Sequence, residues 1–408
     1  MNTSANAVVN LFRRSGAHVS RGTDQPVLPQ RRRPALDGLR GLAALVVVFA
    51  HVLLVAPSLA GAVRGDERAP TGSWPWLLAY TPLHLFWAGG EAVLIFFVLS
   101  GLVLALPMMG GSPFPWRSYY PQRLVRLYVP VVAAVVLAMV QVALVPRHAP
   151  PTSSWWIALH TSPITLKRAV RDALLITGTS GLNTAFWSLK WEVVFSLLLP
   201  LFLIIIAKIG SWRLSFSLLS LVILASCYSS HVSLLYMPIF CLGILTAKKL
   251  PQLDAFGAHF NTFSRTTRSA IALGGCLLLT VHWWMPPIVT PVPPAIARFC
   301  QLQAILIGAC VLIWMFTSTT MGTALGTYRP IAWLGKRSFS LYLVHEPIVV
   351  TTTYVFHGTT NAGLVLLVAL PVSLAVAEIF GRLCEQPSHR LAKAVGRRCA
   401  ATGPSVRG

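Results

Sequence analysis

The chain has 408 residues, of which 55% are hydrophobic and only 11% are charged, and its mean hydropathy is +0.67. Because soluble domains carry about 25% charged residues, this composition excludes a water-soluble globular protein. The 33 Lys and Arg residues outnumber the 11 Asp and Glu residues, which gives a net charge of +22. Such a charge is also typical of nucleic-acid-binding domains, but here the basic residues lie between long apolar segments, as in inner-membrane proteins. The sequence therefore predicts a polytopic membrane protein without a nucleic-acid partner.

Several common kinds of site have no motif in this chain. The seven cysteines include no Cys-x-x-Cys pair and lie mostly in apolar segments, so we interpret them as packing residues and expect no metal site. A Gly-x-Ser-x-Gly nucleophile motif, a P-loop and a His-x4-Asp motif are absent from the sequence. We therefore expect neither an α/β-hydrolase mechanism nor ATP hydrolysis by the chain itself.

The chain begins with a polar, basic segment, residues 1–36, that we expect to be a disordered cytoplasmic tail. The apolar run that follows exceeds a signal-peptide core and lacks a small-residue cleavage site, so it is predicted to be a retained helix. A transmembrane helix needs about 20 apolar residues, and by that measure the sequence predicts an all-α bundle of ten transmembrane helices. They are expected at residues 37–58, 84–107, 127–146, 186–209, 213–229, 232–247, 268–285, 297–316, 338–356 and 361–381.

The distribution of basic residues orients this bundle. With the N-terminus in the cytoplasm, 25 of the 33 Lys and Arg residues lie in cytoplasmic segments or at inner helix ends. The positive-inside rule therefore favours two cytoplasmic termini and a multi-pass location in the inner, cytoplasmic membrane. We expect residues 37–381 to form one transmembrane domain and residues 382–408 to form a second basic tail. The sequence carries no signal for the oligomeric state.

Residues 147–185 form a long connection that is expected on the outer side. They include Trp155, Trp156 and several basic residues, and they are too long for a tight turn. Two interpretations remain open. The segment covers the substrate, as long ordered loops often do, or it contains a helix that lies in the headgroup zone.

Ionisable side chains inside apolar spans are costly and are functional candidates by default. Four of the six glutamates, Glu91, Glu192, Glu346 and Glu378, fall within the predicted spans, and so do His51 and His345. For Glu346 and Glu378 a buried salt bridge or hydrogen bond is an equally good interpretation. The number of such groups nevertheless exceeds what a bundle held together by packing alone would carry.

The first predicted helix carries the most informative pair. Arg40 and His51 are eleven residues apart, which puts them on one helix face about 16 Å apart along the axis. Asp37 precedes Arg40 by three residues and can pair with it. His51 is expected near mid-membrane, where a lone histidine is more often structural, but the aligned arginine favours a functional role.

Two further segments contribute polar groups. In the second helix Ser100 is followed by glycine, a small-residue step that permits close helix packing. Arg123 and Arg126 lie one helical turn apart at the cytoplasmic entrance of the third helix, where two guanidinium groups suit a phosphate-rich ligand. Positive charge that only sets the topology explains the same pair equally well.

The fourth and ninth helices contribute the remaining candidates. Glu192 lies about 9 Å below the outer surface, behind two tryptophans that fit an interfacial belt. Tyr342, His345 and Glu346 fall at positions i, i+3 and i+4, so they form one polar face in the inner half of the ninth helix. Pro347 perturbs that helix and frees backbone carbonyl groups.

Together these motifs resemble the acyltransferase 3 family, integral-membrane O-acyltransferases that modify cell-surface sugars. The resemblance spans residues 34–387 and rests on six motifs in order. They are Asp37-Gly-Leu-Arg40-Gly with His51, Phe-Phe-Val-Leu-Ser100-Gly, Arg123 with Arg126, Trp187-Ser-Leu with Glu192, Ser-Phe-Ser-Leu-Tyr342-Leu-Val-His345, and Glu385-Gln-Pro387. Two departures could alter acceptor or acyl preference: Val-Val-Phe-Ser196 follows Glu192 where the family usually has Phe-Tyr, and Glu346 follows His345 where an apolar residue or Trp is commoner.

The resemblance implies transfer of an acyl group, expected to be acetyl, from cytoplasmic acyl-CoA to a hydroxyl of an extracytoplasmic or lipid-linked saccharide. No metal is expected, and membrane lipid surrounds the bundle. A histidine is the usual base for such a hydroxyl proton, so His51 is expected to be that base or to carry the acyl group transiently. We expect His51, Arg40 and Glu192 as catalytic residues, Arg123, Arg126, Tyr342 and His345 as acyl-CoA-binding residues, and Asp37, Ser100 and Glu385 as supporting residues.

A proton-coupled transporter or flippase of a polar solute is the alternative, because intramembrane Glu and His residues can relay protons. Many carriers show two related halves with broken helices at matching positions. The sequence has no such symmetry, and this favours the acyltransferase.

Overall fold

The computed structural model is a bundle of helices. It describes residues 33–66, 68–110, 114–161, 165–176, 178–229, 231–285 and 292–401. Within these ranges every regular element is a helix, so the predicted all-α fold class is confirmed. The predicted N-terminal tail lies outside the described residues except for its last four, which lead into the first helix.

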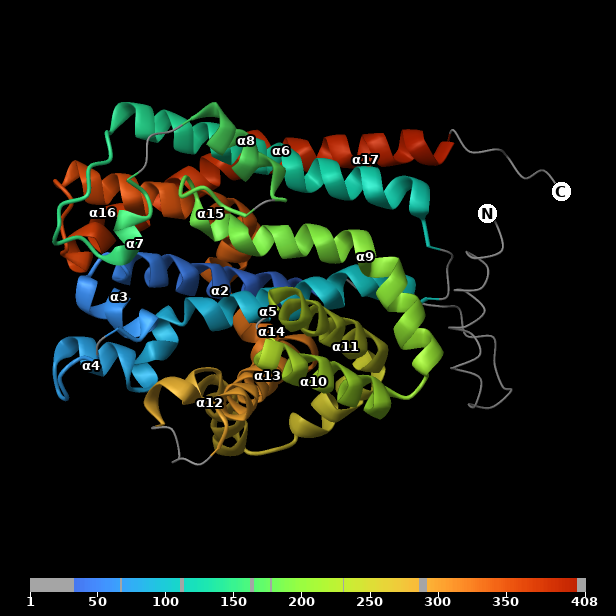
Figure 1. The fold of residues 1–408 in the computed structure, drawn as a ribbon. Helices are drawn as coiled ribbons and strands as arrows, with labels where there is room; N and C mark the ends of the chain where they lie inside the picture. The colour runs from blue at the N-terminus through green and yellow to red at the C-terminus, as the bar shows by residue number, and fades with distance from the viewer. Residues whose placement is uncertain are drawn as a thin grey trace, which may run out of the picture. The chain divides into compact units, whose positions relative to one another are not determined.

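Each of the ten predicted segments contains a helix, and the bounds differ from the predicted ones (Figure 1). These helices are α2 (Pro34–Leu53), α5 (Gly89–Ala105), α6 (Trp116–Leu144), α9 (Trp187–Ile209), α10 (Trp212–Ser229), α11 (Val232–Phe260), α12 (Arg265–Trp284), α13 (Pro294–Ser318), α15 (Arg329–Val355) and α16 (Ala362–Phe380). Shorter elements connect them, namely α3 (Pro57–Arg64), α4 (Trp74–Ala79), η1 (Pro82–Trp87), η2 (Leu106–Met108) and α14 (Thr320–Thr327).

Across the described ranges, eight helices are long and apolar enough to cross a membrane. The helices α12 and α15 are not among them. Basic residues at the start of α12 lower its hydropathy, and α15 has a basic first half and a polar, buried centre. The chain is therefore a multi-pass membrane protein, while the number of ten crossings and the cytoplasmic side of both termini stay predictions.

Two segments predicted as connections or tails contain further helices. The outer segment, residues 147–185, includes α7 (Trp155–Ala158), α8 (Leu166–Leu174) and the short turn η3 (Thr184–Phe186). After α16 the chain continues as a π-helical turn, η4 (Gly381–Glu385), and then as α17 (Gln386–Ala401), where only a basic tail was expected. Buried small residues on α17, among them Ala392 and Gly396, give it a packing face.

Packing divides the chain into two compact units. The first consists of Met1–Leu39, Val93–Pro115 and Trp191–Ala332. The second consists of Arg40–Ala92, Trp116–Lys190 and Trp333–Gly408.

The first unit is held together by close helix packing and stacked aromatic rings. A Cβ atom on Gly101 of α5 would lie 1.9 Å from the carbonyl oxygen of Phe240 in α11, so only glycine permits this approach. The predicted close packing at this Ser-Gly step is therefore present. Phe240 stacks on both Phe97 and Phe195, with ring centroids 4.4 and 4.5 Å apart. At the start of the chain, Arg33 donates two hydrogen bonds, of 2.9 and 2.6 Å, to the carboxylate of Asp254.

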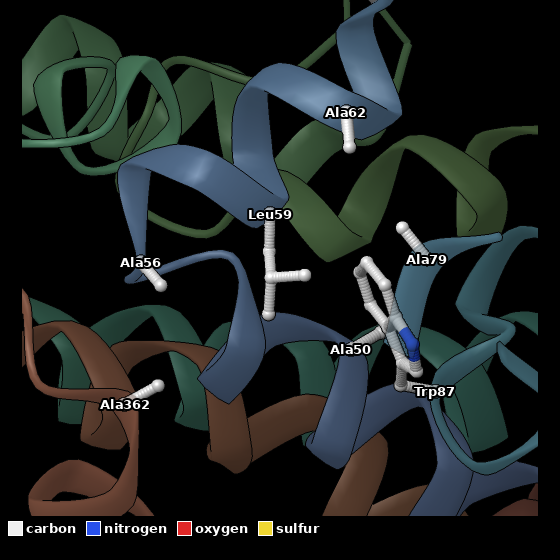
Figure 2. Close-up of a cluster of buried hydrophobic side chains, with 7 residues drawn as sticks. All are labelled: Ala50, Ala56, Leu59, Ala62, Ala79, Trp87 and Ala362. Carbon is white, nitrogen blue, oxygen red and sulfur yellow. The ribbon is translucent and has the colours of Figure 1, made fainter. Parts of the chain in front are cut away.

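In the second unit, a small apolar core forms beside the end of α2 that carries His51. Figure 2 shows Leu59 of α3 and the indole of Trp87 from η1 pointing into one space lined by alanine side chains. The indole N–H of Trp87 donates to the carbonyl of Leu78 at 2.9 Å, which satisfies its polar atom. On another side of this unit α17 packs along α6 (Figure 1).

Candidate active site

The candidate site lies in the second unit, where His51 of α2 contacts the centre of α15. Because α2 ends at Leu53 rather than at residue 58, His51 lies in its last turn, about 26 Å along the axis from Pro34. The imidazole therefore lies near the end of the helix, and its depth in the membrane stays a prediction. Its side chain keeps 16% exposure, whereas His345 and Glu346 beside it are fully buried.

The rings of His51 and His345 are stacked and hydrogen-bonded. The Nδ1 atom of His51 lies 2.7 Å from Nε2 of His345, and the ring centroids are 5.0 Å apart. The Nδ1 atom of His345 lies 2.9 Å from the carbonyl oxygen of Leu341, which can only accept, so this nitrogen carries the proton. His345 then accepts at Nε2, and His51 donates from Nδ1. This tautomer leaves the lone pair of His51 on Nε2, where a base would take up a proton.

Glu346 faces the second nitrogen of His51 and is fixed by hydrogen-bond donors. Its Oε2 atom lies 3.8 Å from Nε2 of His51, which is too long for a hydrogen bond. The backbone N–H and hydroxyl of Thr184 donate to Oε1 at 2.5 and 2.7 Å, and the backbone N–H of Ala185 donates to Oε2 at 2.6 Å. Because all three groups are donors, the carboxyl group is held as a carboxylate.

His160 completes this cluster from the outer segment. Its Nε2 atom lies 2.9 Å from Oε1 of Glu346, and its Nδ1 atom lies 2.8 Å from the carbonyl oxygen of Trp156. Both neighbours accept hydrogen bonds, so both ring nitrogens carry protons and His160 is an imidazolium. A buried carboxylate is thus balanced by one cation, and His51 can remain neutral at rest.

Trp156 covers the cluster. Its ring stacks on His51 with the centroids 5.2 Å apart and the planes 14° apart, and it meets His160 edge-on at 4.8 Å. The indole is almost fully buried. A wide aromatic surface on one side of His51 restricts the ring to a single orientation and excludes water from that face.

Neighbouring polar groups join α15 to the turn η3. The hydroxyl of Tyr342 donates to the carbonyl of Ala185 at 2.9 Å and lies 2.7 Å from the hydroxyl of Ser188. The side-chain amide of Asn183 donates to the carbonyl of Leu343, also at 2.9 Å. These bonds hold the donors of η3 opposite Glu346. Contact of Tyr342 or His345 with a cofactor stays a prediction.

A second polar group in this unit contains two of the predicted residues, Arg126 and Glu385. Ser340 of α15 hydrogen-bonds the carboxylate of Glu385 in η4. Arg126 in α6 lies close enough to act electrostatically on Glu385 and on His389 of α17. Arg123 lies one turn before Arg126 on the same helix, which begins at Trp116, so both arginines belong to α6 itself.

The remaining predicted residues are divided between the two units. In the first unit the hydroxyl of Ser100 donates to Oε1 of Glu192 at 3.2 Å, and Asp37 lies in the first turn of α2. Arg40 belongs to the second unit and lies on the helix face that carries His51. The catalytic roles of Arg40 and Glu192 and the supporting roles of Asp37 and Ser100 stay predictions.

Sequence reasoning missed His160, Thr184 and the role of Trp156. The segment that contains them was singled out for its length and its tryptophans, but neither feature predicts which side chain reaches α15. A histidine four residues after a tryptophan was the available signal. No group of three or more His, Cys, Asp and Glu side chains in the described ranges is arranged to hold a metal ion.

Comparisons with known proteins agree with the motifs. A family model described as "Acyltransferase domain" matches residues 33–382. The chain is 24% identical to "Acyltransferase MdmB" of Streptomyces mycarofaciens over 90% of this chain and 93% of the relative. It is 24% identical to "Putative peptidoglycan O-acetyltransferase YrhL" of Bacillus subtilis (strain 168), over 87% of this chain and 54% of the relative.

A third relative is "Peptidoglycan O-acetyltransferase OatA" of Listeria monocytogenes, to which the chain is 21% identical over 88% of its own length and 56% of the relative. The chain therefore spans about half the length of the two relatives named for peptidoglycan. No solved structure matches the chain.

Proposed function

The chain belongs to the acyltransferase family whose domain model spans residues 33–382, and from that premise we propose that it moves an acetyl group from cytoplasmic acyl-CoA to a saccharide hydroxyl. The chain is a multi-pass membrane enzyme, an O-acyltransferase. The proposal adds the donor, the side of the membrane on which it binds, the class of acceptor and the residues that act.

The single observation that supports this mechanism is the pair formed by His51 and His345. The hydrogen bond between them leaves the lone pair of His51 on Nε2, and Glu346 lies 3.8 Å from this nitrogen. A nearby carboxylate stabilises the imidazolium that forms when Nε2 takes a proton. General-base catalysis by a positioned histidine contributes about 10²–10⁴ to a rate.

The proposed reaction is a direct transfer. The acceptor hydroxyl gives its proton to Nε2 of His51 while its oxygen forms a bond to the thioester carbonyl carbon. The carbon–sulfur bond then breaks, and the CoA sulfur leaves with the proton that His51 received. Acetylated sugar and CoA-SH are the products, and the imidazole returns to its neutral state. Glu192 is proposed to orient the acceptor.

The donor is proposed to enter from the cytoplasmic side. Arg123 and Arg126 offer two guanidinium groups one turn apart, and such groups bind phosphate oxygens by paired hydrogen bonds. Arg40, eleven residues before His51 on α2, is proposed to line the route of the acyl chain. The asymmetry of the basic residues supports an inner-membrane location with both termini in the cytoplasm.

The acceptor is proposed to be an extracytoplasmic or lipid-linked saccharide. Two relatives bear names that specify O-acetylation of peptidoglycan, a saccharide polymer, and this supports the class without identifying the sugar. The outer segment, residues 147–185, supplies His160 and Trp156 to the same cluster as His51, as expected for an element near the acceptor.

Acetyl transfer by membranes that contain the protein tests the proposal. Radiolabel from acetyl-CoA should appear on saccharide with the unchanged protein. His51→Gln should lower the transfer rate about 10²–10⁴-fold without lowering the amount of folded protein. Arg126→Gln should raise the KM for acetyl-CoA about tenfold and leave kcat nearly unchanged, because it removes a contact to the donor and not to the reacting atoms.

Lys167, an exposed residue of α8, provides the matched control for loss of one positive charge. Lys167→Gln should retain both kinetic constants. Transfer that persists in His51→Gln would exclude His51 as the base. Accumulation of an unmodified solute, with no labelled saccharide, would instead identify a carrier.

A further inference from the structure

Arg147 is a buried cation that the proposed mechanism does not use. It follows α6, which ends at Leu144, and belongs to the segment that leads to α7. Only 6% of its surface is exposed. Its Nε and Nη2 atoms have no hydrogen-bond partner among the residues that the structure describes.

A buried guanidinium group in which two nitrogens lack hydrogen-bond partners is costly to the folded state. Burial lowers the pKa of Arg147 to about 10, so the group stays positively charged at neutral pH. Leaving a buried charge uncompensated costs several kcal/mol in proteins generally. Unsatisfied buried polar groups are few in native proteins, and a functional role or a bound ion is among their explanations.

The surroundings of Arg147 relate it to the cluster around Glu346. Tyr354 and Glu346 both lie close enough to interact electrostatically with the guanidinium group. Tyr354 donates a hydrogen bond of 3.3 Å to the carbonyl of Ile157, which lies in α7 between Trp156 and His160. The oxygens of Glu346 accept hydrogen bonds from His160, Thr184 and Ala185 and make none with Nε or Nη2 of Arg147.

The position of Arg147 also separates it from the proposed donor site. Arg126 is the eleventh residue of α6, and the 18 residues from there to Leu144 at the end of the helix span about 27 Å. This length is close to the thickness of the hydrocarbon core. A ligand held by Arg147 therefore approaches from the end of α6 opposite to the one proposed for CoA.

We infer that Arg147 binds an anionic group of the acyl acceptor, a carboxylate or a phosphate ester carried by the sugar. The inference rests on the proposed function, because it assigns the acceptor to the side of α6 opposite to the donor. A guanidinium group presents parallel donors that match two oxygens of a carboxylate or phosphate. An acidic sugar bound there would turn a costly buried charge into a recognition contact, and a neutral sugar would leave the cost in place.

Binding of small acidic sugars to the purified full-length protein in detergent tests this site. The probes are D-glucuronate, D-glucose 1-phosphate and D-glucose, which differ in the presence and kind of anion. A ligand that binds the folded state raises the melting temperature in a saturable way. We expect saturating glucuronate or glucose 1-phosphate to raise Tm by about 2 °C or more, and glucose to have no effect.

Three variants locate the effect. Arg147→Gln should abolish the rise in Tm, and Arg147→Lys, which keeps the charge without the fork, should weaken the apparent affinity about tenfold. Lys167→Gln on the same segment should behave as the unchanged protein does. A rise with glucuronate alone identifies a carboxylate source, and a rise with glucose 1-phosphate alone identifies a phosphate source.

Two results overturn the inference. One is an equal change in Tm of the unchanged protein with charged and with neutral sugars. This result can be interpreted without any variant. The other is a charge-dependent rise that survives in Arg147→Gln but is lost in Arg126→Gln, which would place the anion at the donor arginines. Charge-dependent binding through Arg147 without any acetyl transfer would support the anion site and contradict the proposed function. Acetyl transfer without such binding would support the proposed function and contradict the anion site.

Discussion

Glu346 and Glu378 are both glutamates in apolar sequence, yet the regions around them differ in kind. Glu378 in α16 pairs with Arg337, which donates to Oε1 at 2.7 Å, and with Arg382, whose Nε lies 2.6 Å from the same oxygen. Its side chain remains 19% exposed. Glu346 is fully buried, and its cationic partner is an imidazole, with backbone and hydroxyl groups as the other donors.

The difference lies in whether the partners can exchange protons. Arginine remains charged at every accessible pH, so the pair around Glu378 is a fixed structural bridge. An imidazole can take up and release a proton, so the charge around Glu346 can follow the protonation of His51 during the transfer. The sequence left open a buried salt bridge or hydrogen bond and a functional role for both glutamates. Glu378 forms the salt bridge, and Glu346 makes buried hydrogen bonds too, while its part in proton transfer stays a prediction.

The largest effect should come from Glu346→Gln. The amide would turn a donor toward groups that already donate, and it would leave the imidazolium of His160 without a counter-charge. We expect a loss of about 3–5 kcal/mol in the free energy of unfolding and about 10²-fold slower acetyl transfer. Melting temperature and single-turnover rate measure the two effects. An active, stable Glu346→Gln protein would show that the two regions do not differ as described.

His160→Gln should have a smaller effect than Glu346→Gln. Glutamine retains one hydrogen-bond donor toward Glu346 but carries no charge. We expect about 1–3 kcal/mol lower stability and about tenfold lower kcat with an unchanged KM for acetyl-CoA. His148→Gln is the matched control, because His148 lies on the same outer segment and is exposed. Equal kcat values in the two variants would show that His160 does not contribute to the proposed proton transfer at His51.

The smallest effect should come from Glu378→Gln. Arg337 and Arg382 lie where water reaches them in part, and exposed or partly exposed ion pairs contribute about 1 kcal/mol or less. Acetyl transfer should stay within about twofold of the unchanged protein. A loss of activity as large as that in Glu346→Gln, at unchanged melting temperature, would assign Glu378 to the mechanism and erase the contrast between the two regions.

Much of the architecture could be predicted from the sequence, because the bilayer imposes a length and a composition on each spanning helix. All ten predicted segments contain helices. The polar face of Tyr342, His345 and Glu346 could be predicted as well, since helical periodicity decides which residues share a side. The end of α2 and the helix α17 were not predicted. The length of an apolar run does not show where a helix ends, and it does not reveal a polar, amphipathic helix that packs on a neighbour.

The partners within the site could not be predicted in the same way. His51 and His345 are 294 positions apart, and His160 and Glu346 are 186 apart, so no local periodicity relates them. In the sequence, Arg147 was only one of the basic residues predicted on the outer side.

By itself the sequence determined that the chain is helical, lies in a membrane and carries acyltransferase motifs, because hydropathy and helical spacing are properties of neighbouring residues. The folded chain was needed to show that the imidazole of His160 balances the charge of Glu346 and that Nε and Nη2 of Arg147 are buried without hydrogen-bond partners among the described residues. Hydrogen bonding and desolvation depend on which distant groups come within about 3 Å of one another, and that is settled by packing.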